Sequence, residues 1–263
     1  MSMDRRKFLK VAGVGALGLA GLPASRLLAA GDPRFNPPAE GLQGKRWAMV
    51  IDLTKEAHDD DAVAACHKIH NVPMHTNPRH EIKWLWNTEF KHAFPGLYSQ
   101  RLDESFKAET YKKREALVLC NHCENPPCVR VCPTQATFKR ADGIVLMDFH
   151  RCIGCRFCMA ACPYGARSFN WVDPRTAANL DEPGETMLTF PTRSKGVVEK
   201  CNLCAERLAR GLEPACVENS SNGRMLFGDL GDPGSDVSRI IRSKYTIRRK
   251  QHLGTEPSVF YIV

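Results

Sequence analysis

Several motifs that would indicate a common activity are missing from this chain. Its 263 residues contain no C-x-x-C-H haem-attachment motif, no P-loop and no G-x-S-x-G nucleophile elbow, and beyond the first 30 residues no glycine-rich nucleotide fingerprint. Aromatic residues make up 8% of the chain, and they are not interleaved with basic residues as on nucleic-acid-binding surfaces. These absences argue against c-type haem, nucleotide-dependent chemistry, serine hydrolysis and a nucleic-acid partner.

A strong charge of one sign is also missing from the body of the chain. The net charge is +8, but the first 30 residues hold five basic residues and one acid, so the remainder carries 8 − 4 = +4. Hydrophobic residues make up 43% and charged residues 25%, which is ordinary for a globular protein long enough to bury a core. The charge balance therefore identifies no particular partner.

Long hydrophobic runs are missing as well, since no segment approaches the 18 or so apolar residues of a membrane-spanning helix. An apolar run at 11–22 follows a basic start, and its length fits the hydrophobic region of an export signal. Arg5-Arg6 ahead of this run is typical of a twin-arginine signal. We therefore predict a twin-arginine signal peptide over 1–30 and a periplasmic protein; a membrane anchor or a plain secretory signal is the alternative. The Pro- and Gly-rich stretch 31–44 is predicted to be a linker.

Cysteine, in contrast, is abundant, with 12 residues of which 11 lie in three dense runs. The stretch RCIGCRFCMAACP contains Cys152, Cys155, Cys158 and Cys162. With its final proline it is the C-x-x-C-x-x-C-x-x-x-C-P run of bacterial ferredoxins, in which three thiolates hold one face of a 4Fe–4S cube. Gly154 allows the backbone to come close. The fourth cysteine of such a run binds the neighbouring cluster.

A second run, LCNHCENPPCVRVCP, has the same form with its second gap longer by two residues. The two runs predict an interlocked pair of clusters. The first cluster is predicted to be bound by Cys120, Cys123, Cys128 and Cys162. The second is predicted to be bound by Cys152, Cys155, Cys158 and Cys132.

The third run, KCNLCAERLARGLEPACVENS, has three cysteines, and Ser220 stands where a fourth would be expected. The isolated Cys66 ends a stretch that resembles a degraded run, with its missing cysteines at Glu56, Asp59 and Ala62. These three residues and Ser220 together account for one whole absent cluster. Cys66 is then the distant ligand of a third cluster, which is predicted to be bound by Cys66, Cys201, Cys204 and Cys216.

The 12 cysteines thus predict three 4Fe–4S clusters with no cysteine left over. We expect Glu56 and Asp59 to lie in a charged, solvated loop, with carboxylate ligation of a fourth cluster as the alternative. Structural zinc, which the C-x-x-C pairs would allow, and a disulfide framework, which an exported protein would allow, are two further uses of these cysteines. Neither explains why two of the runs end in Cys-Pro.

The rest of the chain indicates how these runs are arranged. Short strands are expected at 45–52, 116–119, 143–148 and 225–230. Segment 67–115 is a cysteine-free insert in which Trp84 and Trp86 are expected to pack on a core, and segment 167–196 is predicted to be a surface loop. His67, His70, His75 and His80 show no metal-site spacing. The basic tail 239–250 is predicted to be a solvated face or a docking surface.

From about residue 45 onward the chain resembles exported iron–sulfur subunits of respiratory membrane complexes, and within that group the DsrO family of the DsrMKJOP complex of dissimilatory sulfur metabolism. The resemblance rests on ACHKIHNVP, EIKW, HAFPG, LCNHCENPPCVRVCPTQATFKR, DGIV, HRCIGCRFCMAACPYGARSFNW, GVVEKCNLCAERLARGL, YTIRRK and LGTEPSVFYIV. The cysteine motifs alone specify only the wider group.

The resemblance implies an α+β fold of two pseudo-symmetric bacterial-ferredoxin-like units with interlocked cluster-binding loops and cysteine-free insertions. One domain would span 45–263, with the central cluster pair in 116–166 and the third cluster from 66 and 201–216. It also implies an electron-transfer subunit without catalysis of its own, peripheral to the inner membrane. Its partners would be a polytopic quinone-interacting membrane subunit and a periplasmic multihaem cytochrome c. The alternative is the iron–sulfur subunit of a molybdopterin oxidoreductase of the polysulfide, tetrathionate or dimethylsulfoxide reductase type.

Overall fold

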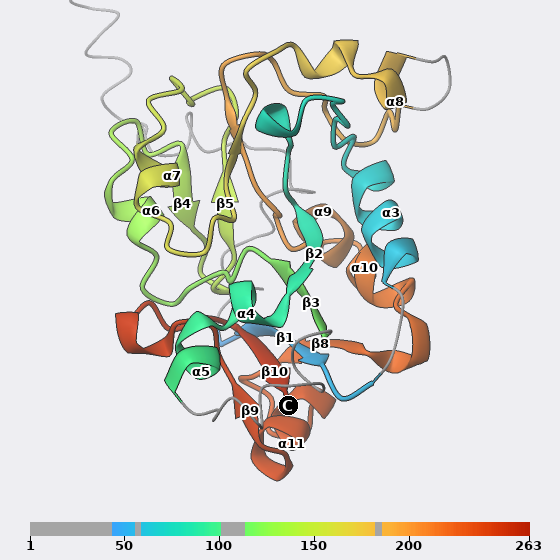
Figure 1. The fold of residues 1–263 in the computed structure, drawn as a ribbon, viewed down its shortest axis with the longest axis vertical. Coiled ribbons are helices and arrows are strands. Elements are labelled where there is room, and N and C mark those ends of the chain that lie inside the picture. The colour runs from blue at the N-terminus through green and yellow to red at the C-terminus, as the bar shows by residue number, and fades with distance from the viewer. Residues whose placement is uncertain (1–43, 56–58, 101–113, 182–185) are drawn as a thin grey trace, which may run out of the picture.

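The computed structural model describes residues 44–55, 59–100, 114–181 and 186–263 (Figure 1). The predicted signal peptide at 1–30 and the predicted linker up to residue 43 lie outside these ranges. In the described part of the chain, no helix combines the length and the apolar character that a membrane crossing requires.

The largest sheet joins the two ends of the described chain. Its strands, in spatial order, are β8 (Met225–Asp229), β1 (Trp47–Asp52), β10 (Val259–Ile262) and β9 (Thr246–Ile247). Strand β1 runs parallel to β10 and antiparallel to β8. Because side chains alternate across a strand, Met49 and Ile51 enter the main core while Ala48 and Val50 pack with helix α11 (Asp236–Ser243). The sheet therefore closes the fold at one end of the molecule (Figure 1).

Three two-stranded antiparallel sheets support the cysteine runs. Their strands are β2 (Leu85–Glu89) with β3 (Glu115–Leu119), β4 (Thr137–Lys139) with β5 (Val145–Met147), and β6 (Ser168–Phe169) with β7 (Val198–Glu199). Strand β3 ends immediately before Cys120, and Lys200 alone separates the end of β7 from Cys201. Buried β-structure thus fixes the start of two of the three cysteine-bearing loops.

The helices are short, and five of them (α3, α6, α7, α9 and α10) contain or directly follow a cysteine. They are α3 (Asp60–Ile69), α4 (Phe90–Ala93), α5 (Pro95–Gln100), α6 (Pro127–Arg130), α7 (Phe157–Ala160), α8 (Ala178–Asp181), α9 (Ala205–Leu208), α10 (Ala215–Glu218), and the 3₁₀ turns Pro78–His80, Pro174–Thr176, Ser221–Gly223 and Gln251–Leu253. Helix α3 packs against α10 (Figure 1). Its buried residues are Ala62 and Cys66, which share one face because they are four residues apart.

The four strands expected from the sequence are confirmed, as β1, β3, β5 and β8. The expectation of packing tryptophans is also confirmed for Trp84, which is fully buried and stacks on His70 with ring centroids 4.6 Å apart. Trp86 is partly buried and packs beside Cys120. The described part of the insert therefore contributes to the core.

The prediction of a surface loop at 167–196 is wrong for much of that segment. It begins with β6, and its described part contains the buried side chains of Phe190 and Arg193. Arg193 is held by Glu199 (Nη2 to Oε2, 2.5 Å) and by the carbonyl oxygens of His70 and Asn71. The prolines and glycines of this segment are typical of turns, but pairing of β6 with β7 and burial of Arg193 depend on contacts distant in sequence.

The basic tail 239–250 is only partly a solvated face. Arg249 is buried, donates from Nε to the carbonyl of Ala93 (3.2 Å) and lies over the ring of Tyr164. Lys250 donates to the carbonyl of Pro163 (2.5 Å). This end of the tail therefore packs against the chain that directly follows Cys162.

Candidate iron–sulfur centres

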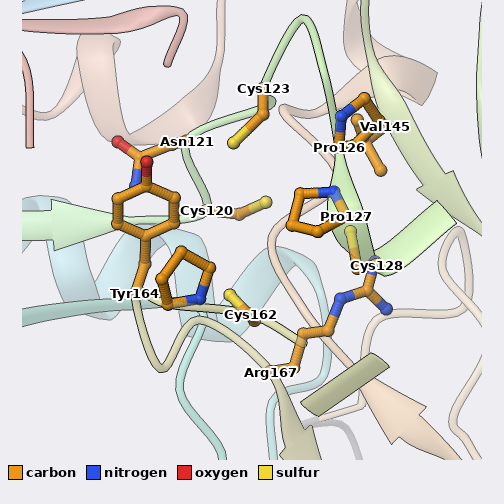
Figure 2. Close-up of a pocket in the computed structure, with 11 residues that line it drawn as sticks. Cys120, Asn121, Cys123, Pro126, Pro127, Cys128, Val145, Cys162, Tyr164 and Arg167 are labelled. Atoms are coloured by element: carbon orange, nitrogen blue, oxygen red, sulfur yellow. The ribbon is translucent and has the colours of Figure 1, made fainter. Parts of the chain in front are cut away.

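The first predicted ligand set gathers around one pocket. Figure 2 shows four cysteine side chains turned toward a common space, with Tyr164 and Arg167 at its edge. The cysteines are Cys120, Cys123, Cys128 and Cys162. Three come from the loop after β3 and from α6, and the fourth comes from the chain just after α7, which places the two central runs in the crossed arrangement that the spacing predicts.

The third predicted set also comes together, although its members are far apart in sequence. Cys66 is buried on α3, and burial together with the sulfurs of Cys201, Cys216 and Cys204 raises its pKa well above the ordinary value. The packing of α3 on α10, which carries Cys216, brings the isolated cysteine to the third run. This proximity is what a distant fourth ligand requires.

For the second predicted set, the structure brings together two of the four members. Burial raises the pKa of the Cys158 thiol on α7, and the sulfurs of Cys128 and Cys152 raise it further. Helix α6 packs beside α7. Cys132 accepts a hydrogen bond on its sulfur from the backbone N–H of Thr137 (3.5 Å). Within the set, these contacts link Cys152 with Cys158, and the complete set of four ligands stays a prediction.

One backbone turn is shared by the first C-x-x-C of each of the three cysteine runs. The residue immediately before the second cysteine has a positive φ in each: 41° at His122, 71° at Gly154 and 57° at Leu203. This region of φ is unfavourable for residues other than glycine, so two of the three loops hold it against a local preference. In the third loop the backbone N–H of Leu203 points at the sulfur of Cys201 (3.3 Å). N–H groups aimed at cysteine sulfur are the contacts that tune iron–sulfur clusters.

Gly154 is required by a neighbour as well as by its φ. A Cβ atom there would lie 2.3 Å from the carbonyl oxygen of Gly196 and 3.2 Å from the ring of Phe169. The sequence predicted that the backbone comes close to a neighbour at Gly154. In the structure that neighbour is the backbone of Gly196, just before β7.

The thiol chemistry of these groups suits a cationic cofactor. Burial raises the pKa of Cys123, Cys201 and Cys216 to about 12, so several thiolates could not coexist there without positive charge beside them. Iron in a 4Fe–4S cube supplies that charge, and sulfur is the donor it prefers. All 12 cysteines are free in the structure, so it contains no disulfide framework. The residues therefore fit iron–sulfur clusters.

His70 was missed by the sequence reasoning, which took it for an ordinary histidine. Its Nδ1 faces the carbonyl oxygen of Cys66 (2.9 Å), and its Nε2 faces Oε1 of the buried Glu206 (2.8 Å). Asn202 donates to Glu206 Oε2 (2.8 Å) and accepts from the N–H of Cys204 (2.9 Å). This chain of bonds joins α3 to the third run. The signal was present, since His70 follows Cys66 by four residues and caps the C-terminus of the same helix.

His70 and Glu206, together with Cys204, also form a candidate zinc site. Ligand atoms of His70, Cys204 and Glu206 lie within 4.8 Å of one another, and mixed nitrogen, sulfur and oxygen donors suit a single zinc ion. Iron and zinc analysis of the third site therefore separates the two interpretations.

Three of the four positions at which the runs lack a cysteine lie among the described residues. Asp59 is buried and pairs with Arg224 (Oδ2 to Nη1, 2.5 Å), which corrects the expectation of a solvated loop at this residue. Ala62 is fully buried, and Ser220 accepts a hydrogen bond from the N–H of Met225 (3.2 Å). Glu56 lies outside the described residues. Two of the four residues that stand in place of cysteines thus have partners in the fold: Asp59 in an ion pair and Ser220 in a hydrogen bond.

Comparisons with known proteins identify iron–sulfur relatives of this chain. A family model described as a 4Fe-4S dicluster domain matches residues 117–178. The chain is 38% identical to the Hdr-like menaquinol oxidoreductase iron-sulfur subunit 1 of Archaeoglobus fulgidus, over 98% of this chain and 97% of the relative. It is 48% identical to a putative dimethyl sulfoxide reductase iron-sulfur subunit of Halobacterium salinarum, over 82% and 78%. It is 33% identical to a tetrathionate reductase subunit of Salmonella typhimurium, over 100% and 89%.

The structure and the dicluster match together define a 4Fe–4S iron–sulfur protein with a ferredoxin-like domain of mixed helices and strands. The chain belongs to the family of 4Fe–4S iron–sulfur subunits of respiratory oxidoreductase complexes, which includes the Hdr-like menaquinol oxidoreductase subunit. The matched segment contains both central runs but neither Cys66 nor the third run.

Proposed function

We propose that the chain carries three 4Fe–4S clusters and relays electrons between a membrane quinone-linked subunit and a periplasmic cytochrome c, in a dissimilatory sulfur-metabolism complex of the DsrO type. When bound, the clusters supply one-electron carriers. The protein's own residues bind them, exclude water from them and fix their surroundings, and this role requires no bond-making chemistry of those residues. The quinone link is supported by the Archaeoglobus relative, whose name is that of a menaquinol oxidoreductase subunit.

The observation that carries the proposed count of three is the turn shared by His122, Gly154 and Leu203. The first two of these loops lie inside the matched dicluster segment, and the third, outside it, repeats their backbone. A loop that holds a residue such as Leu203 in an unfavourable conformation needs a reason. Ligation of a third cluster by Cys201, Cys204 and Cys216, with Cys66 as the fourth ligand, supplies one.

A proposed contact surface lies at the second predicted site. Ile153 and Phe157 alternate with its cysteines and are 67% and 59% exposed. Trp171 is 43% exposed and lies under the guanidinium of Arg156, 4.8 Å from the ring centroid. Apolar side chains exposed beside a redox centre suit a permanent subunit interface better than a brief encounter. We therefore assign this face to the polytopic membrane subunit.

The composition of the native complex tests this function. Affinity purification of the tagged chain from detergent-solubilised membranes is expected to recover a polytopic quinone-reactive subunit and a multihaem cytochrome c. The alternative function, as the electron-transfer subunit of a molybdopterin enzyme, is favoured by the reductase subunits among the relatives. Recovery of a pterin-containing chain without cytochrome would establish that alternative and reject the proposed one.

The proposed export route has its own test. Changing Arg5-Arg6 to Lys-Lys should retain cluster-loaded precursor in the cytoplasm, because the arginine pair is what the twin-arginine pathway recognises. Cell fractionation followed by immunoblotting measures the distribution, and a Lys10→Arg variant, which leaves the pair intact, serves as the control. Unchanged periplasmic accumulation of the Lys-Lys variant would show that another signal is used.

A further inference from the structure

Two buried cations at the cluster sites have no carboxylate partner. The buried cationic side chains in the described ranges are Arg140, Arg167, Arg193, Lys200, Arg224 and Arg249. Three of them pair with buried acids: Arg140 with Asp142, Arg193 with Glu199, and Arg224 with Asp59. The other three, Arg167, Lys200 and Arg249, pair with none in this part of the chain. Arg249 donates to the carbonyl of Ala93 and lies over the ring of Tyr164, whereas Arg167 and Lys200 lie among the cysteines. Burying a charge without a counter-charge is costly, so Arg167 and Lys200 need a nearby negative charge to balance them.

Arg167 touches the surroundings of the first and second predicted sites. Its side chain lines the pocket of the first set (Figure 2). Its Nη1 donates to Oγ1 of Thr137 (3.0 Å), and the backbone N–H of Thr137 points at the sulfur of Cys132, a predicted ligand of the second cluster. Burial alone would lower the pKa of Arg167, yet the sulfurs of Cys128 and Cys158 raise it. The guanidinium therefore lies between two groups of sulfur.

Lys200 occupies the corresponding place between the first and third sites. It directly precedes Cys201, and its Nζ donates to the carbonyl of Cys201 (2.6 Å) and to that of Val145, which lines the first pocket. Burial and the charges of Lys200 and Arg167 lower the pKa of His122, which lies in the first C-x-x-C loop. Both cations thus lie close to the first site, Arg167 in the lining of its pocket and Lys200 on the carbonyl of Val145.

We propose that Arg167 and Lys200 are the internal counter-charges of the iron–sulfur sites, Arg167 shared by the first and second, Lys200 shared by the first and third. Each electron accepted from a partner subunit adds one negative charge to a site. A fixed cation in a water-poor interior stabilises that charge strongly, so each residue raises the reduction potential of the two clusters that it adjoins. Both are positioning residues, because they act on the sites without ligating them. The inference rests on the proposed ligand sets.

The test is a pattern of shifts in EPR-monitored redox titrations of the purified holoprotein. Arg167→Met is expected to move the potentials of the first and second clusters to more negative values and leave the third in place. Lys200→Met should move the first and third and leave the second. A Cys66→Ala variant identifies the third signal. Arg130→Met is the matched control, because Arg130 lies two residues from both Cys128 and Cys132 but is exposed, so water screens its charge.

Conservative variants separate charge from shape. Arg167→Lys should keep potentials near those of the wild type, whereas the neutral Arg167→Gln should shift them as Met does. If the neutral variants fail to retain iron and Arg167→Lys retains it, the charge is still what the sites need. Unshifted potentials in the neutral variants, or equal iron loss in Arg167→Lys and Arg167→Gln, would overturn the proposal. A wild-type protein with about eight irons would instead reject the third cluster, and the Arg167 test would still be decided on the first two.

Discussion

Replacing Cys66 by alanine is expected to reduce the iron content from about 12 to about 8 atoms per chain, or to about 11 if a three-iron cluster survives. The alanine variant removes the only ligand that α3 is predicted to give to the third site, while the eight predicted ligands of the central pair are untouched. Because cluster binding and folding are coupled, we also expect α3 to pack less tightly on α10 in the variant. Iron and acid-labile sulfide analysis with EPR measures the loss.

Val72→Ala is the matched control for Cys66→Ala. Val72 is fully buried just beyond α3 in the same core cluster as Cys66 but bears no ligand atom, so its truncation should destabilise the core and retain all iron. An unchanged iron count in Cys66→Ala would mean that Cys66 is a buried free thiol. A wild-type count near 16 would instead mean that the opening stretch ligates a fourth cluster, and stoichiometric zinc would mean a different metal at the third site.

The cysteine-bearing loops were predictable because their chemistry fixes the spacing of the ligands. Three thiolates around one face of a cube require short, regular steps, so the runs containing Cys120 and Cys152 can be recognised without a structure. The lone Cys66 was assigned by counting, and the packing of α3 on α10 now places it beside the third run. Local rules were enough wherever the cofactor itself imposes the pattern.

The polar groups around the sites were not predictable in the same way, because their partners are distant in sequence. Asp59 meets Arg224 across 165 residues, and His70 meets Glu206 across 136. An acidic stretch such as the one around Asp59 is typical of a solvated loop, and only the fold decides that a buried arginine faces it. Likewise Arg193 lies in a segment whose prolines and glycine indicate turns, although its side chain is fully buried. Tertiary pairing overrode composition at each of these residues.

Removal of the Arg193 charge is expected to be among the most destabilising changes away from the cysteines. Arg193 and Glu199 are fully buried, and Glu199 also accepts hydrogen bonds from Trp84 Nε1 (3.0 Å) and Asn170 Nδ2 (2.6 Å). The guanidinium in turn holds the carbonyl oxygens of His70 and Asn71. This ion pair therefore fastens the insert after α3 to strand β7, which leads directly to Lys200 and Cys201.

Arg193→Met leaves the Glu199 carboxylate buried without its cation, a change that typically costs about 3–5 kcal/mol. For a chain of this size that corresponds to a fall of roughly 6–20 °C in the apparent midpoint of thermal unfolding. Midpoints are compared at one scan rate, because unfolding of a protein with bound clusters is not a simple two-state equilibrium. The double variant R193M/E199Q, which removes both charges, should recover part of the loss.

The exposed pair of Arg175 and Asp173 supplies the matched control, since its ion pair (Nη2 to Oδ2, 2.6 Å) is in contact with water. Arg175→Met should leave the midpoint within about 1–2 °C of the wild type, because exposed ion pairs contribute little. Equal midpoints for Arg193→Met and Arg175→Met would contradict the role assigned to the buried pair. A loss in Arg193→Met that is confined to the third cluster's EPR signal would show that the pair supports the Cys201 loop more than the fold as a whole.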